Sequence, residues 1–166
     1  MKLVDPILQE LEREAVTTRR ILKCVPERQL GWKPHEKSMS LGTLALHMAN
    51  IPDAISRLAN SDELASPPNF VPPEATSSAQ ILEALDTSLA DARTILGAMD
   101  DERASGMWTM AREGQTIMSM PRIAVLRNIL LNHWYHHRGQ MTVYLRLLGV
   151  PLPSVYGPTA DENPFG

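Results

Sequence analysis

Four long segments of the chain repeat apolar residues at alternating steps of three and four positions. The segments span about residues 3–25, 41–58, 77–99 and 119–148 of the 166. This spacing places the apolar side chains on one face of an α-helix, and that face must be covered by other parts of the protein. Helices this long share one core when they lie roughly parallel or antiparallel. The pattern therefore predicts an all-α protein built as a four-helix bundle.

Capping residues mark the ends of these segments. Ser38 and Ser40 are candidate N-caps for the second helix. Ser77 precedes the third helix, and Gln80 three residues later predicts a capping box. Gly149 is predicted to end the last helix, because glycine readily adopts the left-handed conformation found just beyond a helix end.

Two interruptions separate the helices. Residues 60–76 contain four prolines and are predicted to form a surface loop, so that residues 1–166 make one domain. Residues 106–121 are rich in Met and Thr, which predicts either an irregular loop or a small hairpin. The last helix is expected to begin near Ser119, with Pro121 tolerated in its first turn.

Composition excludes several classes of function. Hydrophobic residues make up 43% and charged residues 21% of the chain, as in ordinary soluble globular proteins. A net charge of −3 with scattered arginines gives no electrostatic footprint for nucleic acid. The sequence contains no run of 18 apolar residues, so no membrane span is predicted. The single cysteine, Cys24, excludes an internal disulfide and a cysteine-rich metal site, and a reducing, cytoplasmic location is expected. Cys24 itself is interpreted as a small apolar residue near a helix end.

Three histidines lie within five positions of the last helix, in the stretch NHWYHHRGQ. His133 and His137 continue the apolar stripe and are four residues apart, so both imidazoles can reach one ion. His136 falls on a neighbouring stripe, which indicates packing, a hydrogen bond or a subunit contact. A third ligand is expected from another helix, and His47 on the second helix is the candidate. His35, in a polar loop, is expected to be solvated.

A triad of His47, His133 and His137 would offer three neutral nitrogen donors to a divalent ion and leave a position open for water or substrate. That layout is typical of a catalytic site and differs from a closed structural one. The alternative is that these are hydrogen-bonded core histidines that bind no metal.

Three neighbouring residues suggest further roles. Asp53 is a candidate for orienting an imidazole. Arg138 either binds an anionic group of a thiol cofactor or forms a surface ion pair. Gln140 forms a hydrogen bond either within the site or across a dimer.

Two blocks of the sequence resemble the DinB/YfiT-like superfamily of metalloenzymes, many of which have no known activity. They are GWKPHEKSMSLGTLALHMANIP in the first half and NHWYHHRGQMTVYLRLLGVPLPSVYGPTADE in the second. The resemblance implies a four-helix bundle whose metal ligands map onto His47, His133 and His137. It also implies zinc or nickel as the ion, and a homodimer.

The same resemblance implies a class of chemistry, since better-understood relatives are mycothiol-dependent isomerases and bacillithiol or related S-transferases. We therefore expect a metal-dependent transferase that joins a low-molecular-weight thiol to a small electrophilic substrate, without nucleic-acid or membrane partners. One alternative is a metal-dependent hydrolase, with Asp161 or Glu162 as general base if the C-terminal tail folds over the site. A tail that only caps the bundle would remove that role. The other alternative is a non-catalytic, stress-related metal-binding protein whose ion holds two helices together.

Overall fold

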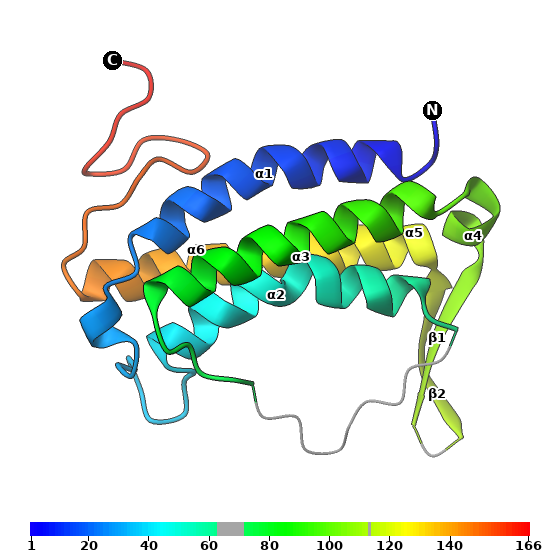
Figure 1. The fold of residues 1–166 in the computed structure, drawn as a ribbon, viewed down its shortest axis with the longest axis horizontal. Helices are drawn as coiled ribbons and strands as arrows, with labels where there is room; N and C mark the ends of the chain where they lie inside the picture. Colours follow the sequence, from blue (N-terminus) through cyan, green and yellow to red (C-terminus); the bar gives the residue numbers. More distant parts are fainter. Residues whose placement is uncertain (63–71, 113) are drawn as a thin grey trace.

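Four long helices in the described part of the chain lie side by side along the longest axis of the molecule (Figure 1). The computed structural model describes residues 1–62, 72–112 and 114–166. The long helices are α1 (Asp5–Lys23), α2 (Leu41–Asn60), α3 (Ser78–Ala98) and α6 (Asn132–Leu147), the last continuing from α5 (Arg122–Val125) and the π-helical η2 (Leu126–Leu131). The shorter elements are η1 (Glu27–Gln29), α4 (Asp101–Ser105), β1 (Met107–Arg112) and β2 (Gln115–Pro121). The predicted all-α four-helix bundle is confirmed, with a small hairpin before the last helical run.

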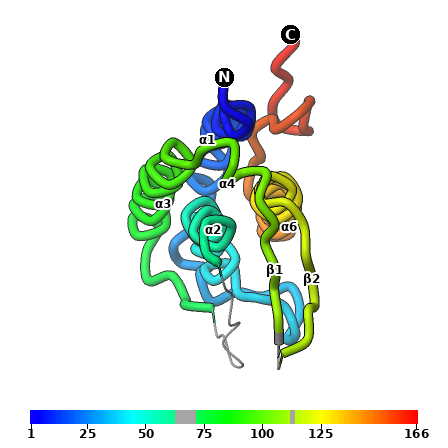
Figure 2. The backbone as a smooth tube through the Cα atoms, turned by 90° about the vertical axis from the view of Figure 1, so that its right-hand side faces the viewer, coloured from blue at the N-terminus to red at the C-terminus, as the bar shows by residue number. Residues whose placement is uncertain are grey.

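Helix α2 forms the centre of the bundle. Viewed along the helices, α3 and α6 lie on either side of α2, and α1 lies on a third side (Figure 2). The predicted stripe of α2 is buried at Leu44 and Met48, but Ala45 and Ala49 on other faces are also fully buried. Burial on more than one face is typical of a helix in the middle of a core, and alanines let its neighbours approach closely. No helix among the described residues is long and apolar enough to cross a membrane.

Serine side chains cap α2 and α3 at their N-termini. Ser40 Oγ accepts a hydrogen bond from the Thr43 N–H at 3.1 Å, as the sequence predicts. Ser77 Oγ accepts one from the Gln80 N–H at 3.1 Å. In a capping box the Gln80 side chain would accept a hydrogen bond from the N–H of the cap residue, Ser77. Here Gln80 Oε1 accepts instead from the N–H of Thr76, the residue before the cap, at 2.7 Å.

The predicted stop at Gly149 is confirmed. Gly149 has a φ of +71°, and its N–H donates to the carbonyl of Arg146 at 3.0 Å. The N–H of Val150 donates to the carbonyl of Leu145, also at 3.0 Å. These two bonds form a Schellman motif, which satisfies carbonyls that the helix end would leave without partners.

The segment before the last helical run is the small hairpin, one of the two forms that the sequence leaves open. Strands β1 and β2 are antiparallel, with a register irregularity at Met110 and a turn in which Gly114 has a φ of +77°. Trp108 of β1 is fully buried and anchors the hairpin to the core. The prediction that the last helix begins near Ser119 is wrong, because residues Ser119 and Pro121 pair with β1 in the sheet.

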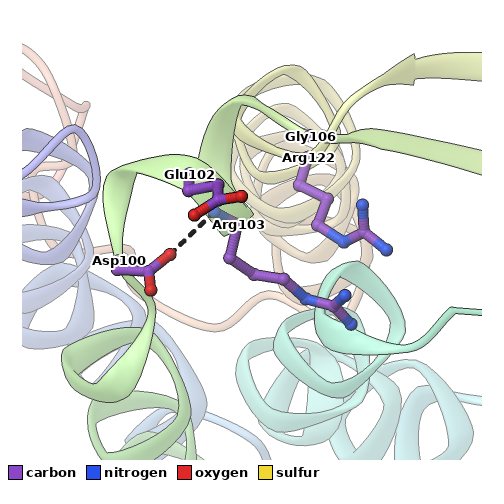
Figure 3. Close-up of a pocket in the computed structure, with 5 residues that line it drawn as sticks. All are labelled: Asp100, Glu102, Arg103, Gly106 and Arg122. Atoms are coloured by element: carbon purple, nitrogen blue, oxygen red, sulfur yellow. Dashed lines mark hydrogen bonds between the residues drawn. The ribbon is translucent and has the colours of Figure 1, made fainter.

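Arg122 joins the hairpin to the end of α2. Its guanidinium is almost fully buried and donates to the carbonyls of Met107 and Ser61, the latter at 3.2 Å. It also donates to Asp62 at 2.9 Å, a carboxylate shared with Arg103 at 2.6 Å. Arg103 and Arg122 both line a cavity of about 390 Å³, and their side chains extend in the same direction (Figure 3). These bonds fix where the last helical run starts.

The predicted surface loop of residues 60–76 lies mostly outside the described residues. Residues 61–62 follow α2, and residues 72–77 lead into α3 without forming helix or strand. The character of the loop as a whole stays a prediction.

A buried ion pair joins α1 to α6. The Arg138 guanidinium is 1% exposed and donates to Glu14 Oε2 at 2.5 Å and to Thr18 Oγ1 at 3.2 Å. Its carbon atom lies 5.2 Å from the ring centre of Tyr135 and 4.9 Å from that of Tyr156, which also hydrogen-bonds it. Of the two roles considered for Arg138 from the sequence, the ion pair is present but buried, so its predicted surface location is wrong. The guanidinium is not free to bind a cofactor anion.

Replacing Arg138 with leucine is expected to lower the free energy of unfolding by about 3–5 kcal/mol, because the mostly buried Glu14 carboxylate would lose its cation. Urea unfolding followed by circular dichroism measures the change. The matched control is Arg93→Leu, which removes an exposed pair with Glu12 between α1 and α3. We expect that control to cost less than about 1 kcal/mol. Equal losses in the two variants would contradict the assignment of a buried, helix-joining pair.

Candidate metal centre

The three histidines predicted to form a triad come together in the structure. His47 Nε2 lies 3.5 Å from His133 Nε2, and His133 Nε2 lies 2.7 Å from His137 Nε2. One nitrogen from each ring lies within 4.8 Å of the other two. The centres of the three rings are 4.5–5.2 Å apart. Residues 86 positions apart in the sequence thus present their nitrogens to one point.

The contact between α2 and α6 sets this arrangement. Trp134 follows His133, Met48 follows His47, and the indole N–H of Trp134 donates to the Met48 carbonyl at 2.9 Å. Both residues are buried, so the bond is protected from water. This bond holds α6 at a defined height and rotation against α2. It does so next to His47 and His133, two of the three imidazoles. Nothing local in the sequence reveals this partner of Trp134, because Met48 lies 86 positions away.

Gln140 orients one of the rings. Its Oε1 lies 2.9 Å from His137 Nδ1, one helical turn along α6. When Nδ1 carries the proton it donates to this oxygen, which leaves Nε2 unprotonated and facing the other two rings. The hydrogen bond within the site is therefore the role of Gln140 in the described chain. Asp53 does not orient an imidazole, because its carboxylate binds Arg57 Nε at 2.6 Å.

The surroundings favour neutral imidazoles. Burial, followed by the charges of His137 and His133, lowers the pKa of His47 to about 4. Burial also lowers the pKa of His133 and that of His137. Neutral imidazole is the form that binds a metal ion, so the site is set for ligation at neutral pH.

Hydrogen bonding among the rings accounts poorly for the cluster. A bond between two imidazole nitrogens needs one donor and one acceptor. Three nitrogens that face one point can form one good pair, here His133 with His137, and the third is left at 3.5 Å. A cation at that point would use all three lone pairs, so the geometry fits a divalent ion better than a set of core histidines.

The remaining histidines lie outside the cluster. His136 is exposed, and its ring meets the His137 ring edge to face with centres 5.0 Å apart. The sequence places it on a neighbouring stripe, in agreement with this position. His35 is exposed, as predicted, and accepts a hydrogen bond from the Lys37 N–H at 3.2 Å.

The buried face of α6 differs from the predicted stripe. His137 is 7% exposed, whereas His133 is half-buried, and the fully buried positions beside them are Trp134, Arg138 and Met141. In η2 the hydrogen bonds reach back five residues, as in the bond from the Asn132 N–H to the Arg127 carbonyl. A π-helical turn holds more residues than an α-helical turn. The side chains that follow it are therefore rotated about the helix axis from the positions that an uninterrupted α-helix would give them. His47 and His133 therefore lie half-buried at the edge of the core, while His137 is buried.

The C-terminal tail does not supply a general base in the described structure. Asp161 accepts hydrogen bonds from Arg146 and from the Leu152 N–H, and Glu162 accepts from Arg20 at 2.6 Å. The arginine partners lower the pKa of both carboxyl groups, which makes them weak bases. The tail packs against α1 and α6 through these bonds, in agreement with the capping role.

Cys24 has the structural role expected of it. It lies at the C-terminal end of α1, is half-buried, and its thiol donates to the Arg20 carbonyl. Burial raises the pKa of this thiol, which disfavours the reactive thiolate form.

Comparison with known proteins agrees with the fold. The model of the DinB family matches residues 1–163. The Bacillus subtilis protein YrdA, described as uncharacterized, is 27% identical over 163 residues, covering 96% of this chain and 91% of YrdA. A DinB-like protein from Bacillus cereus superposes with a TM-score of 0.67 at 26% identity, covering 92% of this chain and 97% of that one. The DinB-like protein YjoA from Bacillus subtilis has the same fold, with a TM-score of 0.66 at 17% identity over 95% of this chain and 99% of its own. The chain belongs to the DinB family.

Proposed function

We propose that this protein is a divalent-metal-dependent transferase that joins a low-molecular-weight thiol, of the bacillithiol or mycothiol kind, to a small electrophile. The observation that supports this proposal best is the convergence of three imidazole nitrogens, from His47, His133 and His137, at the edge of the core. Imidazole donors suit zinc and nickel among the divalent ions.

The residues present fit such an ion. The described cluster holds three protein ligands and no carboxylate or thiolate, so a bound ion would keep its positive charge and an open position. When bound, the ion would favour the thiolate form of a thiol at neutral pH. In the transfer, the sulfur forms a bond to an electrophilic carbon, the leaving group departs with the bonding electrons, and the thiol proton passes to solvent. Gln140 holds His137 in the ligating tautomer, and the contact of Trp134 with Met48 keeps α2 and α6 in register.

Two alternatives are less well supported. Hydrolysis would need a general base near the ion, and the two candidates, Asp161 and Glu162, are paired with arginines. A purely structural ion would be closed by four protein ligands, whereas the cluster in the described residues offers three.

Alanine substitution of each triad member tests the metal site. His47→Ala, His133→Ala and His137→Ala are each expected to weaken zinc binding by more than the roughly 10–100-fold that loss of an outer-shell partner causes. His136→Ala is the matched control, since it removes an exposed imidazole from the same helix, and it should bind zinc like the wild type. Isothermal titration calorimetry measures the affinities. Undiminished binding by His47→Ala would show that the site does not cross from α2 to α6.

Thiol consumption tests the reaction class. Zinc- or nickel-loaded protein, incubated with bacillithiol, mycothiol, glutathione or cysteine and the electrophile 1-chloro-2,4-dinitrobenzene, is expected to form the thioether faster than the metal-free protein. Absorbance of the product gives the rate, and His137→Ala treated with the same metal serves as the control. If no thiol in the panel reacts faster with the loaded wild type than with that control, the transferase proposal is wrong.

A further inference from the structure

A small cavity lies directly against the metal centre. Its volume is about 240 Å³, and His47 forms part of its wall. The same imidazole therefore belongs both to the candidate metal site and to this cavity. The other described lining residues come from the next turns of α2 and from the segment before α3: Asn50, Ile51, Ala54, Ile55, Pro72 and Pro73.

The position of the cavity follows from the periodicity of α2. Residues three to four positions apart lie on one face of a helix, so Ile51 and Ala54 continue the face that carries His47. One helical turn advances about 5.4 Å along the axis. The apolar wall therefore begins about one turn from the imidazole, which is within the length of a small organic molecule.

The lining selects an uncharged, apolar group. Among the described lining residues, His47 and Asn50 carry the polar side chains, and the rest are aliphatic or proline. The cavity at the hairpin is different in character, since Asp100, Glu102, Arg103 and Arg122 line it (Figure 3). A charged group would lose its hydration in the pocket beside His47 without gaining a partner of opposite charge.

The size indicates part of a ligand. Sites that enclose a whole drug-sized ligand have volumes of about 300–1,000 Å³. A pocket of about 240 Å³ is below that range and suits a short alkyl chain or a single ring. The rest of the ligand would then extend to the imidazoles.

We propose that this pocket, formed by Asn50, Ile51, Ala54 and Ile55 of α2 with Pro72 and Pro73, binds a short aliphatic or single-ring group of a substrate that reacts at the metal centre. The proposal rests on the proposed function, since it gives that substrate its chemical class. The group can be carried by the thiol or by the electrophile, because both must come close to the same imidazoles.

A series of n-alkanethiols tests the pocket through binding. Ethanethiol, butanethiol and hexanethiol are titrated into the cobalt-loaded protein, and the thiolate-to-metal absorption band reports the affinity. Each methylene that enters the pocket is expected to tighten binding roughly fourfold, the effect of burying one CH₂ group. Ala54→Phe fills the pocket from an exposed helical position and should abolish the dependence on chain length.

The control variant makes the same change elsewhere. Ala90→Phe adds a ring at an exposed position of α3 that does not line the pocket, and it should keep the full dependence on chain length. Equal affinity for all three thiols in the wild type would overturn the assignment of the pocket to the thiol. Persistence of the gradient in Ala54→Phe would place the apolar contact elsewhere and would overturn it as well.

A second measurement separates the pocket from the proposed function. n-Hexanol is titrated into metal-free protein while the methyl signals of Ile51 and Ile55 are followed by NMR. Shifts in the wild type that are lost in Ala54→Phe support the pocket, even if no thiol gives an absorption band and the transferase proposal fails. If the methyl signals shift but the three thiols bind with equal affinity, the apolar group belongs to the electrophile. No shift in the wild type, together with a flat or absent thiol response, would overturn the pocket.

Discussion

The close packing of α6 on the central helix α2 is the contact on which the candidate site depends. Burial of Leu44, Ala45, Met48 and Ala49 holds the first half of α2 in the core, and the bond from the Trp134 indole to the Met48 carbonyl fixes α6 against it. His47 and His133 are the sequence neighbours of those two residues. A displacement of one helix by a single turn, about 5.4 Å, would separate their nitrogens, which now lie 3.5 Å apart.

Two consecutive residues of α6 show how the protein keeps different polar groups inside the bundle. Burial lowers the pKa of His137, which hydrogen-bonds Gln140 and turns its other nitrogen towards the cluster. Arg138 pairs with the Glu14 carboxylate of α1 and lies beside two tyrosine rings. A buried polar group without a partner is costly, so each residue has partners suited to its own charge. One face of α6 therefore binds α1 through an ion pair, while the adjacent face is left with imidazoles that can hold an ion.

Much of this could be predicted from the sequence, because periodicity and capping act locally. The four long helices, the caps at Ser40 and Ser77 and the stop at Gly149 follow from residues a few positions apart. The triad was also predictable, since His133 and His137 share a helix face and His47 is a histidine on another amphipathic segment. The features that could not be predicted depend on distant partners: the burial of Arg138 needs Glu14, and the strand at Ser119 needs Thr109 across the hairpin. The π-helical turn of η2 shifts the buried face of α6, and the apolar pattern of residues 126–131 gives no sign of it.

The central claim is that His47, His133 and His137 together hold one divalent ion and leave it open to a small molecule. X-ray absorption spectroscopy of the zinc-loaded protein tests this claim most directly, because it counts the ligands and measures their distances. The account predicts three imidazole nitrogens at about 2.0–2.1 Å and a non-protein ligand that added thiol replaces with sulfur at about 2.3 Å. Four protein ligands with no change on adding thiol, or a shell that stays the same in His47→Ala, would contradict it.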